Sequence, residues 1–465
     1  MLSYFKKNYQ FKLVLSLVII SVTWVNFNHV FWVNQNVINH DVNHYYSYLP
    51  AFFYEKDLKL NFLNDTNNIV TEGRYYSPKK TPENGYVIKM SMGMAVSYLP
   101  FFGLAHAYAQ WSGDEVNGFS PPYHFALQFS TLIYFLIGLY FLWKFLLLNY
   151  SKLISAVTIL LICFGTNVFF YLTFRAALSH IIGFTGIAML MYYSQKWHQN
   201  PSSTTSIKIG LLIGFLTLVR PINLLAVIPF LLYNFHGLNS LKSQIYFFVN
   251  QKINLLIIGF TAFLVVLPQL LYWHYATGHF FFNSYVEEGF YFSEPHVIKA
   301  LFGFRKGWLI YTPIMLLSLI GIWLIYKTKK SYFYSILIFT SIYIYVAFSW
   351  WCWWYGGSYG QRVMIDIYPI LALPLAAFLH WVSDLKKFPK KIWIIAISAL
   401  TLLNLFQTTQ AKFNIIHYDS MTFDSYVKAF GVMTNNNEIK KLLQKPDYEN
   451  ALKGEVEREL PYLGE

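Results

Sequence analysis

The sequence predicts an all-α integral membrane protein, and three features support this class. Of the 465 residues, 56% are hydrophobic and only 12% are charged, about half the charged share of an average soluble domain. Eleven apolar runs are suited to membrane-spanning or half-spanning helices. Tyr and Trp gather near the ends of these runs, as they do at membrane interfaces. A soluble enzyme of this length is excluded, because it would need many more surface charges.

Most of the apolar runs are close to the ~20 residues that a helix needs to cross the hydrocarbon core. Two short ones, 209–219 and 222–234, are separated by Arg220 and Pro221. Lysines precede the first of these runs and follow the second, and lysines favour the cytoplasmic side. We therefore expect the pair to enter the membrane from the cytoplasm and return, with Arg220 at or near the opposite, extracytoplasmic face. The other runs are 11–33, 123–148, 153–172, 177–195, 254–275, 308–326, 332–350, 367–383 and 392–410.

The lysines assign the sides of the membrane. With the N-terminus in the cytoplasm and sides alternating at each run, the cytoplasmic segments hold 16 basic residues and one acid, Asp384. The outer segments hold 19 basic and 21 acidic residues, so the net charge of +13 follows the positive-inside rule and indicates no nucleic-acid partner. Segment 87–111 is apolar enough to span, but a span there would move the lysine-rich loops outside. We therefore expect an interfacial helix.

This topology divides the chain into a transmembrane domain, 1–410, and an extracytoplasmic C-terminal tail, 411–465. The first run lacks a small-residue cleavage site and is expected to remain as a signal anchor. The first outer loop, 34–122, contains apolar residues at helical spacing between 39 and 58, which predicts an amphipathic helix on the membrane surface. Two cysteines are too few for a disulfide framework.

Three arginines fall at the outer ends of separate helices: Arg175, Arg220 and Arg362. A guanidinium binds anionic oxygens bidentately, so this grouping favours a phosphate or pyrophosphate carried on a lipid. Arg362 ends the stretch "SWWCWWYGGSYGQR" (349–362), whose tryptophans alone are typical of an aromatic girdle with a snorkelling arginine. Its glycines favour a binding site, because they permit tight turns and close approach of the backbone to a ligand.

In this arrangement the chain resembles the GT-C glycosyltransferases, polytopic enzymes that use a polyprenyl-phosphate sugar donor. The resemblance covers roughly 11–410 and is nearest to the bacterial protein-mannosyltransferase-like and aminoarabinose-transferase-like members. It rests on the long first outer loop with an early acid, Asp41, on "GFLTLVRP" (214–221), on "YGGSYGQR" (355–362) and on "FGTNVFFYLTFRAALSH" (164–180). The loop lacks the Asp-Glu pair of some relatives, and "IKMSMG" (88–93) lacks the prolines of the family's element there.

The resemblance implies a GT-C-type bundle of about 11 transmembrane or half-spanning helices and an inverting transfer of sugar to an acceptor hydroxyl on the extracytoplasmic face. Asp41 is the expected general base, although an acid at this position is equally typical of a helix cap. The phosphate of the donor is expected to bind basic residues: Arg362, Arg220, Lys89, Arg305 and Arg175. The sugar or acceptor is expected to contact acidic, His and aromatic side chains: Glu287, Glu288, His180, Tyr45, Trp354 and Tyr359.

No metal or other cofactor is expected, since the chain has no Asp-x-Asp motif. His40, Asp41 and His44 share a helix face but lack a further ligand at zinc-like spacing. The expected partners are a polyprenyl-phosphate sugar, a lipid, glycan or protein acceptor, and the lipid of a bacterial inner (plasma) membrane. Two other classes stay open: a lipid-linked-sugar flippase or transporter, and an enzyme of the O-antigen ligase or polymerase type.

Overall fold

The structure is a computed structural model, and it describes residues 8–64, 78–81, 85–434, 436–455 and 460–462. Helices make up 69% of the chain. Within these ranges the strands form only two short antiparallel pairs, β1 (Lys79–Lys80) with β2 (Tyr86–Val87) and β3 (Gln444–Lys445) with β4 (Leu460–Pro461). The all-α prediction is confirmed.

Each of the eleven apolar runs coincides with a helix or a pair of joined helices. Among the described residues, six helices are long and apolar enough to cross a membrane, and four apolar helices are shorter. The protein is therefore a polytopic membrane protein. The helices of the bundle are α2 (Tyr9–His29), α6 (Pro121–Leu147), α7 (Lys152–Phe164), α9 (Ser179–Gln199), α10 (Ser203–Val219), η3 (Pro221–Ala226) with α11 (Val227–Leu231), α13 (Lys252–Thr277), α16 (Met315–Thr328), α17 (Lys330–Phe348), η5 (Arg362–Ile367) with α18 (Tyr368–Asp384), and α19 (Lys387–Lys412).

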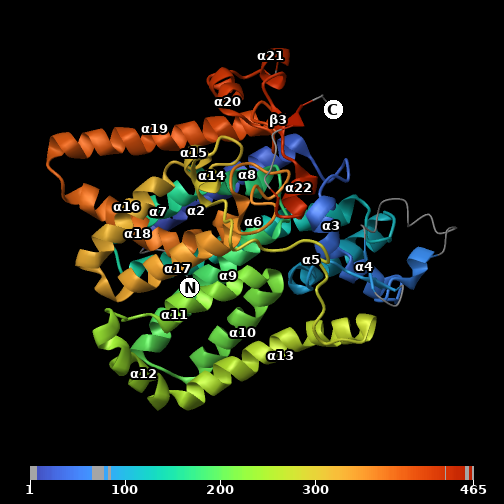
Figure 1. Cartoon of the computed structure of the whole chain (residues 1–465), viewed down its shortest axis with the longest axis horizontal. Helices are drawn as coiled ribbons and strands as arrows, with labels where there is room; N and C mark the ends of the chain where they lie inside the picture. The colour runs from blue at the N-terminus through green and yellow to red at the C-terminus, as the bar shows by residue number, and fades with distance from the viewer. Residues whose placement is uncertain (1–7, 65–77, 82–84, 435, 456–459, 463–465) are drawn as a thin grey trace.

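The core of the bundle is built around the segment formed by η5 and α18. In its most apolar part, 94% of the residues are buried, against 22% for α13 and for α19, which lie at the edges of the bundle (Figure 1). Small residues allow the inner helices to approach closely: a Cβ on Gly321 of α16 would lie 1.9 Å from the carbonyl oxygen of Pro374 in α18. Close backbone packing of this type is typical of membrane helices, where apolar burial does not by itself drive association.

The remaining elements lie at the two ends of the bundle. In Figure 1, α3 (His40–Tyr46), α4 (Tyr48–Phe53) and α5 (Gly93–Ser112) lie at the right, and α12 (Leu241–Asn250) and the turn between α18 and α19 lie at the left. These are the segments that lysine counting assigns to opposite sides of the membrane. The other short elements are η1 (Asn61–Asn64), α8 (Val168–Thr173), η4 (Leu238–Ser240), α14 (Val297–Phe302) and α15 (Trp308–Tyr311).

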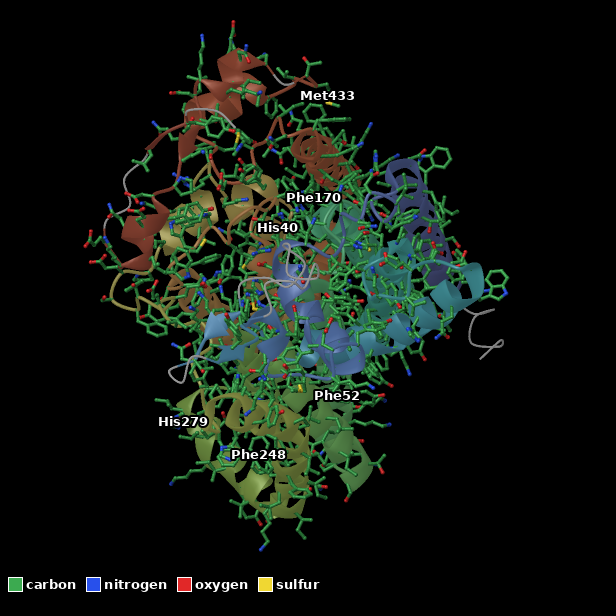
Figure 2. The ribbon with its side chains drawn as sticks, turned by 90° about the vertical axis from the view of Figure 1, so that its right-hand side faces the viewer. His40, Phe52, Phe170, Phe248, His279 and Met433 are labelled. Atoms are coloured by element: carbon green, nitrogen blue, oxygen red, sulfur yellow. The ribbon has the colours of Figure 1, made fainter. Side chains whose placement is uncertain are left out.

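The first outer loop covers the end of the bundle. Figure 2 looks onto this end, with His40 and Phe52 near its centre, Met433 above them and His279 below. The amphipathic segment predicted between 39 and 58 forms two helices, because α3 ends at Tyr46 and α4 begins at Tyr48. The helix predicted in 87–111 is α5, which begins only at Gly93; its position at the membrane interface stays a prediction.

The described part of the C-terminal tail is folded. It contains α20 (Phe423–Ala429), α21 (Asn437–Lys440), the β3–β4 pair and α22 (Tyr448–Leu452). Arg305 Nη1 donates hydrogen bonds to the backbone oxygens of Asp419 (2.9 Å) and Gln444 (3.2 Å), and Tyr291 Oη donates to the backbone oxygen of Leu452 (2.5 Å). The described part of the tail is therefore attached to the 276–307 loop and forms a small lobe beside it.

Candidate active site

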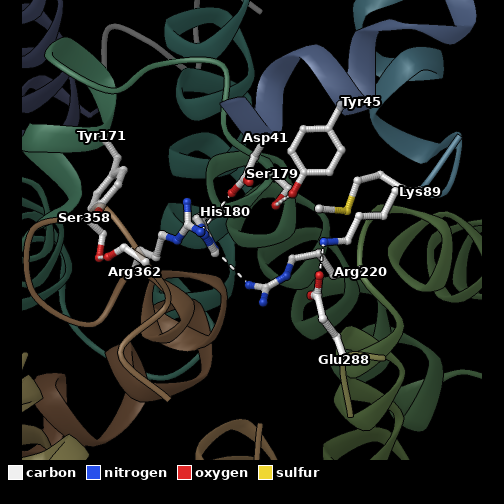
Figure 3. A network of polar contacts seen from close by, with 12 residues as sticks. Asp41, Tyr45, Lys89, Tyr171, Ser179, His180, Arg220, Glu288, Ser358 and Arg362 are labelled. Atoms are coloured by element: carbon white, nitrogen blue, oxygen red, sulfur yellow. Dashed lines mark hydrogen bonds and ion pairs between the residues drawn. The ribbon is translucent and has the colours of Figure 1, made fainter. Parts of the chain in front are cut away.

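A cavity of about 570 Å³ opens between the first outer loop, the end of α10, the 276–307 loop and the 349–362 stretch. A volume of this size is typical of small-molecule sites, which range over roughly 300–1,000 Å³. Seven of the twelve site residues predicted from the sequence line it (Figure 3): Asp41, Tyr45, Lys89, His180, Arg220, Glu288 and Arg362. Residues from six separated parts of the chain thus meet at one place.

Asp41 and Arg362 form an ion pair at the wall of this cavity. Arg362 Nη2 lies 2.8 Å from Asp41 Oδ2, and 15% of the arginine side chain and 32% of the aspartate side chain are exposed. Asp41 lies in the first turn of α3. The turn before η5, with Gly356 (φ +61°) and Gly360 (φ +56°) in the left-handed region, delivers Arg362 to the cavity. A side chain at either glycine would be strained.

The ion pair also sets the protonation of Asp41. Burial alone would raise the pKa of this carboxyl, but the nearby basic groups, chiefly the Arg362 guanidinium with His44 and Lys89, hold the pKa below its usual value. One turn further along α3, burial lowers the pKa of His44 to about 4. At neutral pH Asp41 is therefore ionised and His44 is neutral.

Arg220 reaches the cavity because a proline follows it. The ring of Pro221 disfavours a helical conformation at the preceding residue, so α10 ends at Val219 and Arg220 is extended (φ −157°, ψ 125°). Its Nη1 donates to Asp366 Oδ2 at 2.8 Å, and Nδ1 of His180 lies 3.0 Å from the same oxygen. The Asp366 side chain is completely buried. A buried carboxylate thus stands behind the two cavity-lining groups.

Lys89 and Glu288 form the third pair, in which the lysine Nζ contacts Glu288 Oε1. The Nε1–H of Trp351 donates to the other carboxylate oxygen at 3.3 Å. Lys89 follows β2, and its backbone oxygen accepts a hydrogen bond from Ser284 Oγ at 2.6 Å. This bond connects the first outer loop to the 276–307 loop. Each cation in the cavity wall therefore has a carboxylate partner.

Five predicted site residues lie outside this cavity. Arg305 and Trp354 belong to the contact with the C-terminal lobe, where the Arg305 guanidinium carbon lies 5.9 Å from the centre of the Trp354 ring and Trp354 Nε1 donates to Tyr448 Oη at 3.2 Å. Tyr359 is buried among Tyr171, Tyr311 and Phe170. The remaining two, Arg175 and Glu287, are exposed side chains beyond the cavity lining.

Most residues that line the cavity are not among those predicted, and two unpredicted residues at or near it bear on the site. Asp366 is one: an acid only four residues after Arg362, in an otherwise apolar run, is a signal that could have identified it, since ionisable residues at membrane depth usually mark a site. Tyr448 is the other, and it reaches the cavity from α22 because the C-terminal tail folds back. No pattern in the tail predicts that return.

Within the ranges that the structure describes, no group of three or more His, Cys, Asp or Glu side chains is arranged to hold a metal ion. Asp41 is paired with an arginine. His40, at the start of α3, has a φ of +46°.

No protein-family model matches the chain, and no curated protein matches it significantly. Among solved structures, the chain is similar to the apo crystal structure of the Archaeoglobus fulgidus oligosaccharyltransferase, with a TM-score of 0.51 and 12% sequence identity. The likeness covers 92% of this chain and 58% of that one, so this chain spans little more than half the length of its neighbour. The likeness shows the fold. This chain is an all-α membrane bundle whose fold resembles that of the oligosaccharyltransferase.

Proposed function

We propose that the protein is a membrane glycosyltransferase that moves a sugar from a polyprenyl-phosphate donor to an acceptor hydroxyl, with Asp41 as general base. The observation that carries this proposal is the cavity itself, in which a carboxylate and three cations from separate segments meet. The fold it shares with an oligosaccharyltransferase supports a reaction of this class. The proposed site opens on the extracytoplasmic face of a bacterial plasma membrane, in agreement with the distribution of lysines.

The transfer requires two kinds of group. Asp41 accepts the proton of the acceptor hydroxyl while the oxygen of that hydroxyl bonds to the anomeric carbon of the sugar. The bond from that carbon to the phosphate oxygen breaks, and its electron pair leaves with the polyprenyl phosphate. A base and acceptor on the side opposite the phosphate give inversion. General base catalysis contributes about 10²–10⁴-fold to such a rate, and fixed cations at the leaving oxygens usually contribute most.

Arg362 connects the two roles in this proposal. In the free protein its guanidinium lies 2.8 Å from Asp41 and lowers the pKa of that carboxyl, which makes Asp41 ionised but weakly basic. A donor phosphate attracts the same guanidinium through two oxygens. As Arg362 turns to the phosphate, Asp41 loses its cation, and burial then raises its pKa. Binding of the donor therefore makes Asp41 a stronger base when it is needed.

The remaining groups of the cavity have supporting roles. Arg220 is the second phosphate ligand, because its side chain lines the cavity and is 17% exposed. Lys89 and Glu288 line the opposite wall as a pair, with Glu288 available to sugar hydroxyls. The proposal needs no metal, since the arginines can neutralise the monophosphate.

The decisive experiment compares lipid-linked sugars in cells that have and lack the protein. A transferase predicts accumulation of a polyprenyl-phosphate sugar in the deletion strain and loss of one glycan product. Expression of the wild type should restore the product, whereas Asp41→Asn at equal protein level should not. Loss of lipid-linked sugar from the outer leaflet, with no accumulation, would favour a flippase instead. Unchanged glycans and lipids would contradict both functions.

A further inference from the structure

The proposed mechanism gives no role to the buried carboxylate of Asp366. Asp366 lies at the end of η5 and is completely buried. All its hydrogen bonds within the described residues go through one oxygen, Oδ2, which accepts from Arg220 Nη1 at 2.8 Å and lies 3.0 Å from His180 Nδ1. A buried charge costs several kcal/mol unless it is paired. The ion pair with Arg220 therefore stabilises the charge of Asp366 beneath the cavity wall.

The neighbouring helix is shaped to receive this carboxylate. A Cβ atom on Gly183 of α9 would lie 1.8 Å from Asp366 Oδ1 and 2.8 Å from Asp366 Cγ. Real Cβ atoms never approach so closely, so any larger residue at 183 would move the aspartate. On α9, His180 reaches the cavity and Gly183, one turn later, leaves room for the carboxylate of Asp366 from η5.

The position of the carboxylate determines which nitrogen of His180 carries the proton. Nδ1 lies 3.0 Å from Asp366 Oδ2 and 2.9 Å from Nη1 of Arg220, which itself donates to that oxygen at 2.8 Å. A proton on Nδ1 forms a hydrogen bond to the carboxylate, whereas a bare Nδ1 could accept from Arg220 but would turn its lone pair toward the negative charge, so the carboxylate favours the proton on Nδ1. Nε2, on the other side of the ring, is then unprotonated and accepts hydrogen bonds. His180 lines the cavity, and none of the hydrogen bonds of its ring involves Nε2 within the described residues.

We propose that Asp366 is a positioning residue that keeps the proton of His180 on Nδ1 and holds Arg220 at the cavity wall, so that His180 presents Nε2 as an acceptor for a hydroxyl group of the bound sugar. The proposal rests on the proposed function for its substrate, but the state of the ring belongs to the free protein. Asp366 touches no substrate and acts through its two partners. A carboxylate that merely stabilised the fold would not control the tautomer of His180.

The first test measures that tautomer directly. The full-length protein, labelled with ¹⁵N-histidine and placed in lipid nanodiscs, is examined by NMR near neutral pH, and the signals missing in His180→Gln are assigned to residue 180. The wild type should have Nδ1 protonated and Nε2 bare. A ring protonated on Nε2 in the wild type would overturn the proposal, whether or not the protein transfers sugar.

Two variants then perturb the carboxylate in different ways. Asp366→Asn removes its charge, and Gly183→Ala displaces it while keeping the charge. Both should increase the fraction of His180 with the proton on Nε2. Gly259→Ala in α13 is the matched control, since its Cβ meets nothing within 4 Å, and it should leave the ring unchanged. If one variant fails to fold, the other decides. A wild-type tautomer in a folded variant would contradict the proposal.

The second test concerns use of the ring. With lipid-linked sugar extracted from the deletion strain, kcat/KM of Gly183→Ala should fall about 10–100-fold, the value of one or two lost hydrogen bonds to the substrate. Gly259→Ala should retain wild-type activity. Binding of farnesyl phosphate, which has no sugar hydroxyl, should change less than kcat/KM. If farnesyl phosphate binding and kcat/KM of Gly183→Ala fell by the same factor, only Arg220 would be affected, and the proposed role of His180 would be wrong. Absence of transfer and of farnesyl phosphate binding in the wild type would instead overturn the proposed function.

Discussion

Replacement of Arg362 by methionine should change both the level and the pH dependence of transfer. At 2.8 Å and an effective dielectric constant of about 20, the attraction between Asp41 and Arg362 is on the order of 6 kcal/mol before desolvation. Solvent at the 32% exposed carboxylate and the cost of burial reduce this value. What remains of the attraction is enough to hold the pKa of Asp41 below its usual value despite burial.

The direction in which the pH profile moves follows from the two opposing effects on the pKa of Asp41. In the wild type the guanidinium keeps the pKa of Asp41 below its usual value, so kcat/KM should be flat between pH 5 and 8 with respect to this group. Without the guanidinium, burial raises the pKa of Asp41, and the acidic limb of the profile should move to higher pH. The plateau should also fall about 10²–10³-fold, because a preorganised donor to the leaving phosphate is lost.

The assay measures initial rates of transfer from extracted lipid-linked sugar between pH 4.5 and 8. Arg175→Met is the matched control, since it removes the same charge from an exposed site outside the cavity; it should change kcat/KM less than about threefold. Arg362→Lys separates charge from geometry: it should restore the position of the acidic limb but not the plateau. An Arg362→Met enzyme with the wild-type pH profile would refute the coupling between Asp41 and Arg362.

Three further outcomes are expected. Asp41→Asn should lower kcat about 10²–10⁴-fold while farnesyl phosphate still binds, and full transfer at unchanged protein level would remove Asp41 from the mechanism. A double-mutant cycle with Lys89→Met and Glu288→Gln, followed by SDS unfolding in mixed micelles, should give a coupling free energy of about 0.5–3 kcal/mol; additive effects would mean that the pair does not form. Gly360→Ala, at φ +56° and with its Cβ 3.2 Å from Tyr311 Cβ, should lower the free energy of unfolding by about 1–2 kcal/mol, and an unchanged value would contradict the described turn.

Hydropathy and charge predicted most of the fold because the bilayer imposes length and apolarity on every spanning helix. Each apolar run is a helix, but local breaks escaped the prediction. The run 153–172 contains two helices, since α7 ends at Phe164 and α8 begins at Val168. Apolarity alone does not reveal such a break. Whether the C-terminal tail folds could not be predicted, because its attachment depends on Arg305 and Tyr291 far away in sequence.

The candidate site was predictable in part for a similar reason. Counting lysines assigns each loop to one side of the membrane. It therefore places a residue at one end of the bundle without fixing its depth or lateral position. It therefore grouped Arg362 and Arg220, which share a cavity, with Arg305, which holds the C-terminal lobe. Pro221 is a local signal that α10 ends before Arg220. The partner of Arg220 was hidden, because a contact across 146 residues leaves no trace in one sequence.

The most direct measurement is a cryo-EM structure of the protein in nanodiscs with farnesyl phosphate. The account predicts the phosphate oxygens within hydrogen-bonding distance of Arg362 and Arg220, with Arg362 turned away from Asp41. Phosphate bound instead in the separate cavity lined by Arg305 and Lys441, or an Asp41–Arg362 pair that stays closed beside a bound phosphate, would contradict it.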